Sequence, residues 1–260
     1  MLKLIISAAE LTPEDAVIEV GPGLGVLTGE LAERAACLAA VELDSNLAAI
    51  LRQSLALFNN VTVINDNILK LNPGTLLQKL PSVCPGLGEG VLSYKVVANL
   101  PYYIASPVLR LFLETVLKPR LMVVMLQKEV AQAITAKPGR MSLQSVSVQF
   151  YGAPEIVAVV PARCFYPAPE VDSAILRIRV YPEPPLTVNE AGFFGLVRGG
   201  FTAARKQLPN SLSQGLNLPK AEVTAWLEAV GIEPRRRAGT ISLEEWAKLW
   251  RVFDRARGEG

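Results

Sequence analysis

Histidine is absent from this chain of 260 residues. Its absence excludes Ser-His-Asp and Cys-His nucleophiles, histidine-ligated metals and imidazole general bases. Cysteine is scarce. The three that occur, Cys37, Cys84 and Cys164, are too few and too far apart for a metal cluster or a disulfide framework. We therefore expect a protein without a metal, located in the reducing cytoplasm.

Long apolar runs are also missing. No stretch reaches the roughly 18 apolar residues that a membrane span needs, and residues 1–4 do not resemble a secretory signal. Hydrophobic residues nevertheless make up 50% of the chain, which is enough for one ordinary domain and a small second one. The net charge of +2 does not by itself identify a polyanionic partner, but basic residues are concentrated in the last quarter.

Hydrophobic periodicity predicts alternating strands and helices, followed by helices alone. The strands are expected at 16–20, 38–43, 61–65, 95–100, 121–127, 155–160 and 173–180. The helices are expected at 26–35, 45–57, 75–80, 107–117, 190–204, 219–230 and 243–257. The alternation indicates an α/β fold with a parallel, Rossmann-like sheet.

Two segments rich in proline or glycine separate these elements. Residues 81–90 are typical of a surface loop, and the proline-rich residues 181–185 suit an extended linker. We therefore predict a catalytic domain over residues 1–181 and a small all-helical domain over residues 186–260.

Glycines at alternate positions follow the first predicted strand. Gly21, Gly23 and Gly25 let the backbone turn tightly and approach a ligand, although the pattern also fits an ordinary strand-to-helix turn. The second strand ends near Glu42, whose carboxylate can accept both hydroxyls of a ribose. Together they predict a nucleoside-containing cofactor. Glu19 either contacts that cofactor or steadies the glycine loop.

The third strand is followed by Asp66 and Asn67, and the fourth ends in the tetrapeptide Asn99-Leu100-Pro101-Tyr102. Glycine loop, Glu42, Asp66 and this tetrapeptide, in that order, resemble the S-adenosylmethionine-dependent amino-methyltransferases. Redox dinucleotide enzymes lack an Asn-x-Pro-Tyr signature. The resemblance implies S-adenosyl-L-methionine as cofactor, with the Asp66 carboxylate accepting from its adenine amine and with Asn67 and Asn99 also among the residues that bind it. An Asx-turn remains the alternative for Asp66.

The tetrapeptide suits methyl transfer to an amine. The side-chain carbonyl of Asn99 and the backbone carbonyl of Leu100 can each accept an amine hydrogen, which directs the nitrogen lone pair at the methyl group. Pro101 stiffens the turn, and Tyr102 offers a ring on which a base can stack. No basic residue is required. A plain turn is the alternative interpretation.

Three further segments resemble motifs of one family. Residues 165–173 resemble its Phe-x-Pro-x-Pro-x-Val-x-Ser motif, in which Phe165 or Tyr166 closes the other face of a flipped base. Residues 201–212 and 235–243 resemble the signatures of its helical domain. The RNA-binding candidates there are Arg205, Lys206, Arg235, Arg236 and Arg237. For Phe165 and Tyr166 the alternative is packing against the core. For the basic residues it is a solvated helix face.

Over nearly its whole length the chain resembles the bacterial small-subunit ribosomal RNA adenine dimethyltransferases. The resemblance implies dimethylation of two adjacent adenosines near the 3′ end of that RNA, on a pre-ribosomal particle. We expect a cytoplasmic monomer. Members begin with a segment containing Gly-Gln-Asn-Phe-Leu, which does not occur upstream of Gly21, so we expect the chain as given to bind adenosine-like ligands but to methylate poorly.

Three other functions stay open at this stage. The large-subunit ribosomal RNA methyltransferases that confer antibiotic resistance share the core motifs, although residues from 201 onward favour the small-subunit enzymes. A DNA adenine methyltransferase is disfavoured because the core holds no recognition insertion. A non-catalytic assembly factor could bind the ribosomal particle through the basic helices alone.

Overall fold

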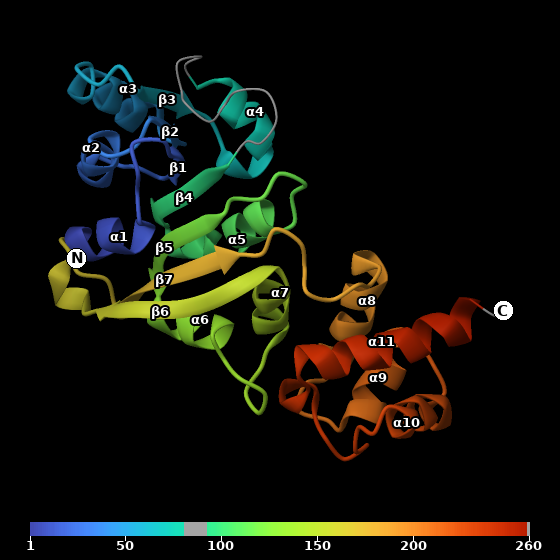
Figure 1. Cartoon of the computed structure of the whole chain (residues 1–260). Coiled ribbons are helices and arrows are strands. Elements are labelled where there is room, and N and C mark those ends of the chain that lie inside the picture. The colour runs from blue at the N-terminus through green and yellow to red at the C-terminus, as the bar shows by residue number, and fades with distance from the viewer. Residues whose placement is uncertain (81–92, 259–260) are drawn as a thin grey trace. The chain divides into compact units, whose positions relative to one another are not determined.

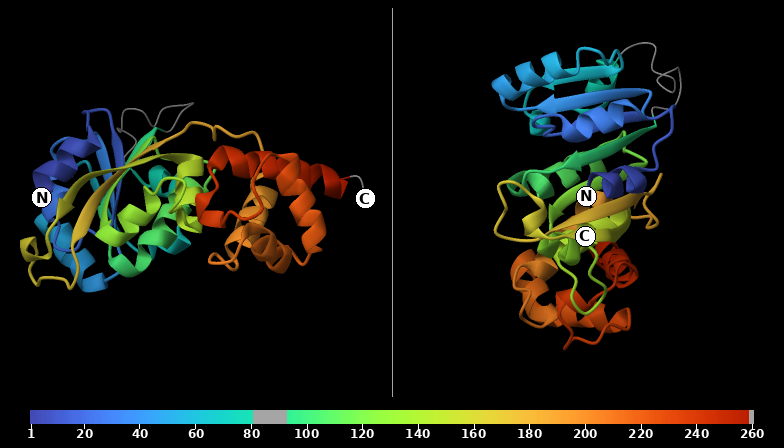
Figure 2. Two further views of the ribbon diagram at one scale, coloured as in Figure 1. Left: turned by 90° about the horizontal axis from the view of Figure 1, so that it is seen from below. Right: turned by 90° about the vertical axis from the view of Figure 1, so that its left-hand side faces the viewer.

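The computed structural model describes residues 1–80 and 93–258, so the predicted loop at 81–90 and Cys84 lie outside the described residues. The chain divides into two units. The first comprises Met1–Ala131 and Gly152–Pro182, and the second comprises Gln132–Tyr151 and Glu183–Gly260. Residues 132–151 thus belong to the second unit. The described part of this unit after residue 182 contains helices and loops but no strand (Figures 1 and 2).

The first unit contains a seven-stranded sheet in the order β3-β2-β1-β4-β5-β7-β6 (Figure 1). Its strands are β1 Ala16–Val20, β2 Cys37–Glu42, β3 Val61–Asn65, β4 Tyr94–Asn99, β5 Leu121–Gln127, β6 Gly152–Val160 and β7 Ser173–Val180. All seven predicted strands are confirmed, most of them to within a residue at each end. The sheet brings the carboxyl ends of β1 to β4 to one edge, where open α/β sheets bind ligands.

The expectation of a wholly parallel sheet is wrong at one side. Strands β1 to β5 are parallel where they pair, but β7 runs antiparallel to both β5 and β6. A parallel pair needs a crossover connection, usually a helix. Between β6 and β7 the chain forms only a short 3-10 turn, Ala162–Cys164, so the two strands pair as neighbours of opposite direction.

Some helices of the first unit begin at side-chain caps. The helices of this unit are α1 Leu2–Ala9, α2 Val26–Ala32, α3 Ser45–Ser54, α4 Pro73–Gln78 and α5 Ala105–Leu113. A further helix, α6 Lys128–Ile134, begins in the first unit and ends in the second. The Asp44 side chain accepts hydrogen bonds from the amides of Asn46 (2.8 Å) and Leu47 (3.0 Å) at the start of α3. An N-cap of this kind stabilises a helix by satisfying its first amides.

The helices of the second unit are α7 Leu143–Tyr151, α8 Glu190–Phe201, α9 Leu208–Leu216, α10 Lys220–Ala229 and α11 Leu243–Gly258. Two of them, α7 and α9, are not predicted by hydrophobic periodicity. In α7, Val146, Val148 and Phe150 alternate with polar residues as in a strand, yet all three are buried in a helix. Packing overrides propensity here; the Phe150 ring stacks 5.2 Å from that of Phe193 of α8.

The core of the first unit is the sheet itself. Every residue of β1 and β2 is buried, and Ile5 and Ala8 of α1 join the same apolar cluster as Val17 and Val97. One ion pair is buried with it: Lys95 Nζ lies 2.9 Å from Asp15 Oδ2 and donates to the carbonyl of Ala9 at the end of α1. Because a buried charge is tolerated only when it is paired, this contact anchors α1 to the sheet.

Three observations bear on the expectations from composition. No helix in the described residues is long and apolar enough to cross a membrane. Among those same residues, no group of His, Cys, Asp or Glu side chains is arranged to hold a metal ion. Cys164 is a free, exposed thiol, whereas Cys37 is disulfide-bonded; one disulfide within the chain is the most that three cysteines allow.

Candidate active site

The glycine loop follows β1 and takes a conformation that other residues rarely adopt. Gly21, Gly23 and Gly25 have φ angles of 66°, 58° and 83°. A Cβ atom on Gly25 would come within 2.6 Å of Leu51 Cδ1, and one on Gly21 would lie 3.3 Å from Pro101 Cδ. The loop therefore needs glycine for its backbone, and at Gly21 it passes directly against the Asn-Leu-Pro-Tyr turn.

Glu42 joins this loop to the ends of β2 and β3. Its buried carboxylate accepts from the amide of Gly23 (3.1 Å) with Oε2 and from the amide of Asp44 (2.9 Å) with Oε1. The Asp66 amide donates to the Glu42 backbone carbonyl at 3.0 Å. An ionised carboxylate has about four acceptor sites. These two hydrogen bonds therefore orient Glu42 and leave it able to accept further hydrogen bonds from hydroxyl groups.

Glu19 lies beneath the loop as a buried acid without a hydrogen-bonding partner for one of its oxygens. It is 1% exposed, and neither its Oε2 nor Thr28 Oγ1 has a partner in the described part of the chain. Burial raises the pKa of Glu19 to about 8, an effect that the Thr28 hydroxyl opposes and the Glu42 carboxylate reinforces. At neutral pH Glu19 is therefore mostly a neutral acid with one unsatisfied oxygen, which a donor from a ligand would satisfy.

The end of β3 combines local and longer-range hydrogen bonds. Asp66 is exposed, and its Oδ1 accepts from the amide of the next residue, Asn67, at 2.7 Å. This is not the bond to the second residue on that defines the Asx-turn considered from the sequence. Asn67 caps the 3-10 helix Ile68–Lys70 by accepting from the Leu69 amide. Asn65 was not predicted from the sequence. Its side-chain amide donates to the backbone carbonyls of Glu42 (3.0 Å) and Leu43 (3.1 Å). It holds β2 and β3 together beside Asp66.

The Asn-Leu-Pro-Tyr turn presents one free polar side chain at the end of β4. Asn99 is exposed, and its side chain makes no hydrogen bond within the described residues. Leu100 is buried, and its amide donates to the Met125 carbonyl of β5 at 3.0 Å. The Tyr102 hydroxyl lies 2.8 Å from Ser173 Oγ at the buried start of β7. The turn is thus fixed on both sides, and Asn99 remains available to a substrate.

The proline-rich turn before β7 separates its two aromatic residues. Phe165 is half-buried and packs against the core cluster that contains α1, whereas Tyr166 is fully exposed. Asp172 pins the turn: its Oδ1 accepts from the Ala162 amide at 3.0 Å, and its Oδ2 lies 3.6 Å from Lys128 Nζ. The alternative considered from the sequence, packing against the core, therefore applies to part of the Phe165 ring. The Tyr166 ring projects into solvent.

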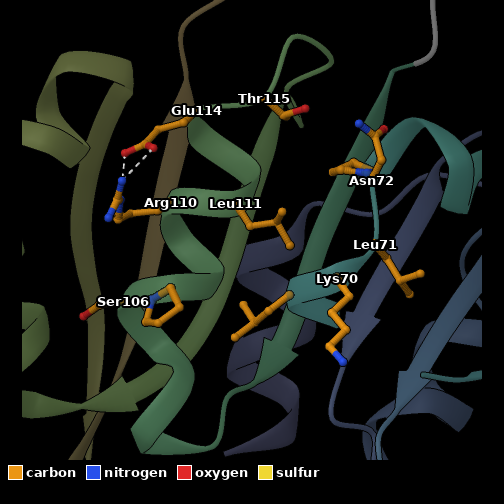
Figure 3. Close-up of a pocket in the computed structure, with 11 residues that line it drawn as sticks. Lys70, Leu71, Asn72, Ser106, Arg110, Leu111, Glu114 and Thr115 are labelled. Atoms are coloured by element: carbon orange, nitrogen blue, oxygen red, sulfur yellow. Dashed lines mark hydrogen bonds and ion pairs between the residues drawn. The ribbon is translucent and has the colours of Figure 1, made fainter. Parts of the chain in front are cut away.

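A cleft of about 830 Å³ lies between α5 and the segment that joins β3 to α4 (Figure 3). In Figure 3 Leu111 points from α5 towards the segment that carries Lys70 and Leu71, while Arg110 and Glu114 pair along α5 at 2.9 and 3.1 Å. The lining residues are Leu69, Lys70, Leu71, Asn72, Pro73, Ser106, Pro107, Arg110, Leu111, Glu114 and Thr115. None of them was a predicted site residue, because they come from two separate segments and form no sequence motif.

In the second unit the two predicted basic segments lie side by side. The Leu208 amide donates to the Arg236 carbonyl at 2.7 Å, which joins the turn before α9 to the turn before the 3-10 helix Ala238–Thr240. The exposed cations around this contact are Arg205, Lys206, Arg235 and Arg237. Residues that are 30 positions apart in sequence therefore form one basic surface, which suits contact with phosphates.

Arg236 differs from its two neighbours. Its guanidinium is 28% exposed and donates to both carboxylate oxygens of Glu245, at 2.9 Å for the Nη2 bond, and to the Thr240 hydroxyl at 3.2 Å. The hydrogen bond from Arg236 lowers the pKa of Glu245. Arg236 therefore stabilises the fold of the second unit rather than presenting a free charge to solvent.

Comparisons with known proteins identify what this chain is similar to. The family model described as ribosomal RNA adenine dimethylase matches residues 1–255. "Ribosomal RNA small subunit methyltransferase A" of Dehalococcoides mccartyi is 50% identical over 256 residues, covering 97% of this chain and 84% of the relative. The protein of the same name from Bacillus cytotoxicus is 42% identical, covering 96% and 85%.

Two solved structures share the fold over nearly the whole chain. The 23S rRNA methyltransferase ErmE is 30% identical with a TM-score of 0.72, covering 97% of this chain and 96% of that one. A dimethyladenosine transferase from Plasmodium falciparum has a TM-score of 0.80 at 22% identity, covering 98% and 95%. The predicted fold class, an α/β Rossmann-like sheet with a helical region after it, is thus confirmed.

Proposed function

The chain belongs to the ribosomal RNA adenine dimethylase family, and from this premise we propose that it dimethylates two adjacent adenosines near the 3′ end of small-subunit ribosomal RNA. The methyl donor is S-adenosyl-L-methionine. One observation carries the proposal: the glycine loop and the Asn-Leu-Pro-Tyr turn meet at Gly21 and Pro101, so cofactor and target amine share one edge of the sheet. The names of the curated relatives favour small-subunit RNA.

The residues at this edge fit an adenosine-containing methyl donor. A cradle of positive-φ glycines leaves no Cβ between backbone and ligand, Glu42 accepts the ribose hydroxyls, and Asp66 accepts from the adenine amine with its second oxygen. Asn67 lies beside Asp66, and the unsatisfied oxygen of Glu19 lies beneath the loop. The cofactor supplies a methyl group on a sulfonium, which the protein need not activate.

The residues of β4 act on the other reactant. The Asn99 side chain and the Leu100 carbonyl accept the two hydrogens of the adenine amine, which draws its nitrogen towards pyramidal geometry and directs the lone pair along the line of displacement. The protein thus positions the nucleophile and does not deprotonate it beforehand. This accounts for methyl transfer by a chain that contains no histidine.

The aromatic residues hold the flipped base. Tyr102 stacks on one face, and its hydroxyl bond to Ser173 fixes the plane of the ring. Phe165 or Tyr166 covers the other face; Phe165 offers only part of its ring, whereas Tyr166 is fully exposed. Stacking between two rings holds the amine at the position that Asn99 and Leu100 require.

The second unit supplies the contacts to the rest of the RNA. We assign phosphate contacts to Arg205, Lys206, Arg235 and Arg237, which surround the bond between Leu208 and Arg236. The substrate is a pre-ribosomal particle in the cytoplasm, and the chain acts on it as a monomer. The predicted helical domain, residues 186–260, makes these contacts.

Methyl transfer to isolated ribosomal subunits tests this proposal. With labelled S-adenosyl-L-methionine, we expect label in unmodified small subunits and none in large subunits. Label in large subunits instead would favour the function named for the 23S rRNA methyltransferase to which the chain is 30% identical. A calorimetric titration with the cofactor then distinguishes an enzyme, which binds it, from an assembly factor that binds the particle alone.

A further inference from the structure

The last helix, α11, has an apolar side and a cationic side. Its buried residues are Trp246, Ala247, Leu249, Trp250 and Phe253. Lys248, Arg251 and Arg255 are all exposed and follow one another at spacings of three and four residues. Side chains at these spacings lie along one line on a helix. We call these three residues the α11 cation row; at about 1.5 Å per residue it spans about 10 Å.

These cations have no ion-pair partners in the part of the chain that the structure describes. Elsewhere the protein pairs cations with acids at i,i+4 where helices end: Arg34 lies 2.9 Å from Glu30 at the end of α2, and Arg110 lies 2.9 Å from Glu114 at the end of α5. An ordinary solvated helix face is stabilised by such pairs. The α11 cation row lacks them.

Two of the acids near the row are bound to other groups, whereas Asp254, three residues after Arg251, is exposed and makes no ion pair within the described residues. Glu245 binds the guanidinium of Arg236, and Glu244 accepts a hydrogen bond from the Ser242 hydroxyl at 2.7 Å. Arg257 lies 5.1 Å above the Phe253 ring and so has a contact within α11. The row itself places like charges three and four residues apart, an arrangement that destabilises an isolated helix.

Compensation of the helix dipole explains only part of this pattern. Cations are favourable in the last turn of a helix, where Arg255 lies, but the effect fades beyond that turn. Lys248 and Arg251 lie further towards the middle of α11. A line of uncompensated positive charge is instead stabilised by a partner that carries regularly spaced negative charge, and nucleic acid phosphates have this property.

We propose that the α11 cation row binds phosphates of the RNA substrate as a second surface, in addition to the four cations around Leu208. The inference rests on the proposed function, because it takes the polyanion to be the ribosomal RNA of the substrate. The row contacts the backbone and does not touch the target base. It therefore contributes to affinity and its salt dependence, and leaves the methyl-transfer step itself unchanged.

Salt-dependent binding tests the row directly. The full chain and the triple variant Lys248→Gln, Arg251→Gln, Arg255→Gln are titrated with unmodified small subunits at several salt concentrations. Each lost phosphate contact should reduce the slope of log K against log salt by roughly 0.7–0.9. We expect a reduction of roughly 2–3 for the variant, which loses three contacts, with unchanged cofactor affinity and an unchanged kcat at saturating substrate. Circular dichroism verifies that the helices are intact.

A control variant removes the same charge from the same unit. Lys137, Arg140 and Lys220 are exposed and belong to neither surface, so their triple replacement by Gln should change the slope little. Exchange of Lys for Arg and Arg for Lys within the row should restore wild-type behaviour. An equal loss in row and control variants, or an unchanged slope in the row variant, overturns the inference. Failure of the unsubstituted chain to methylate small subunits counts against the proposed function instead.

Discussion

The Tyr102 hydroxyl and Ser173 Oγ lie 2.8 Å apart although 71 positions separate them in the chain. The bond connects the turn after β4 to the start of β7, beside Gln127 of β5. Ser173 is fully buried, and Tyr102 is half-buried. The two motifs that hold the target base in the proposed function are therefore joined by one hydrogen bond, and the orientation of the Tyr102 ring depends on Ser173.

Ser173→Ala tests that dependence. A neutral hydrogen bond contributes about 0.5–1.5 kcal/mol, so kcat/KM for small subunits should fall roughly 2- to 10-fold. Cofactor affinity should stay unchanged, because Ser173 touches no cofactor residue. Tyr102→Phe removes the same bond, and the double variant should be no worse than the poorer single one. Additive losses would mean that the two residues act separately.

Glu42→Ala should weaken binding of S-adenosyl-L-methionine. Hydrogen bonds to a charged group contribute about 1.5–3 kcal/mol, which corresponds to a loss of about tenfold or more. The amides of Gly23 and Asp44 also lose their acceptor, so the melting temperature should fall as well. Glu42→Gln preserves one acceptor and is the control. Calorimetry that finds equal affinity in a folded Glu42→Ala variant removes Glu42 from the cofactor site.

Asn99→Ala should affect turnover and little else. Its side chain makes no hydrogen bond in the described structure, so the melting temperature and the cofactor affinity should remain those of the unsubstituted chain. Removal of an interaction made with the amine in the transition state lowers kcat. We expect a loss of about 100-fold or more, because a small misplacement of the reacting groups costs roughly this much. A variant that loses cofactor affinity but turns over normally contradicts this role.

Much of the fold follows from local pattern. Strands such as β1 and β5 are continuous apolar runs bounded by turn residues, and the glycine loop is visible because Gly21, Gly23 and Gly25 need a conformation that side chains resist. Helix α7 was not predicted because its alternating valines match a strand, and only packing against α8 decides otherwise. The antiparallel β7 was missed because strand direction depends on the connection, not on the strand.

The candidate site divides in the same way. Residues within a motif, such as Asn99 and Glu42, could be named from the sequence. Their partners could not: Asn65, Ser173 and the Leu208–Arg236 contact become visible only once distant segments are adjacent. Arg236 shows the reverse problem, because in a run of three arginines nothing in the sequence indicates which one pairs with Glu245.

Glu19 predicts a pH dependence of stability. Its pKa is raised to about 8 in the folded protein from an ordinary 4.5, so the folded state holds a proton that the unfolded chain releases. The contribution to stability is complete below about pH 4.5 and is lost as the pH rises towards 8. Glu19→Gln remains neutral throughout. The melting temperature of this variant, relative to the unsubstituted chain, should therefore increase between pH 5 and pH 8; a constant difference refutes the shift.

The three consecutive arginines should separate into one structural residue and two binding residues. Arg236→Ala removes the bidentate hydrogen bonds to the Glu245 carboxylate, so we expect a loss of about 1–3 kcal/mol in the free energy of unfolding. Arg235→Ala and Arg237→Ala remove exposed charges and should leave unfolding within about 0.5 kcal/mol. Each should instead lower the salt dependence of subunit binding by roughly 0.7–0.9. Denaturation and subunit titration on the same three variants compare these effects. If Arg236→Ala unfolds like the other two while its salt slope falls, Arg236 contacts RNA and its pairing with Glu245 is dispensable.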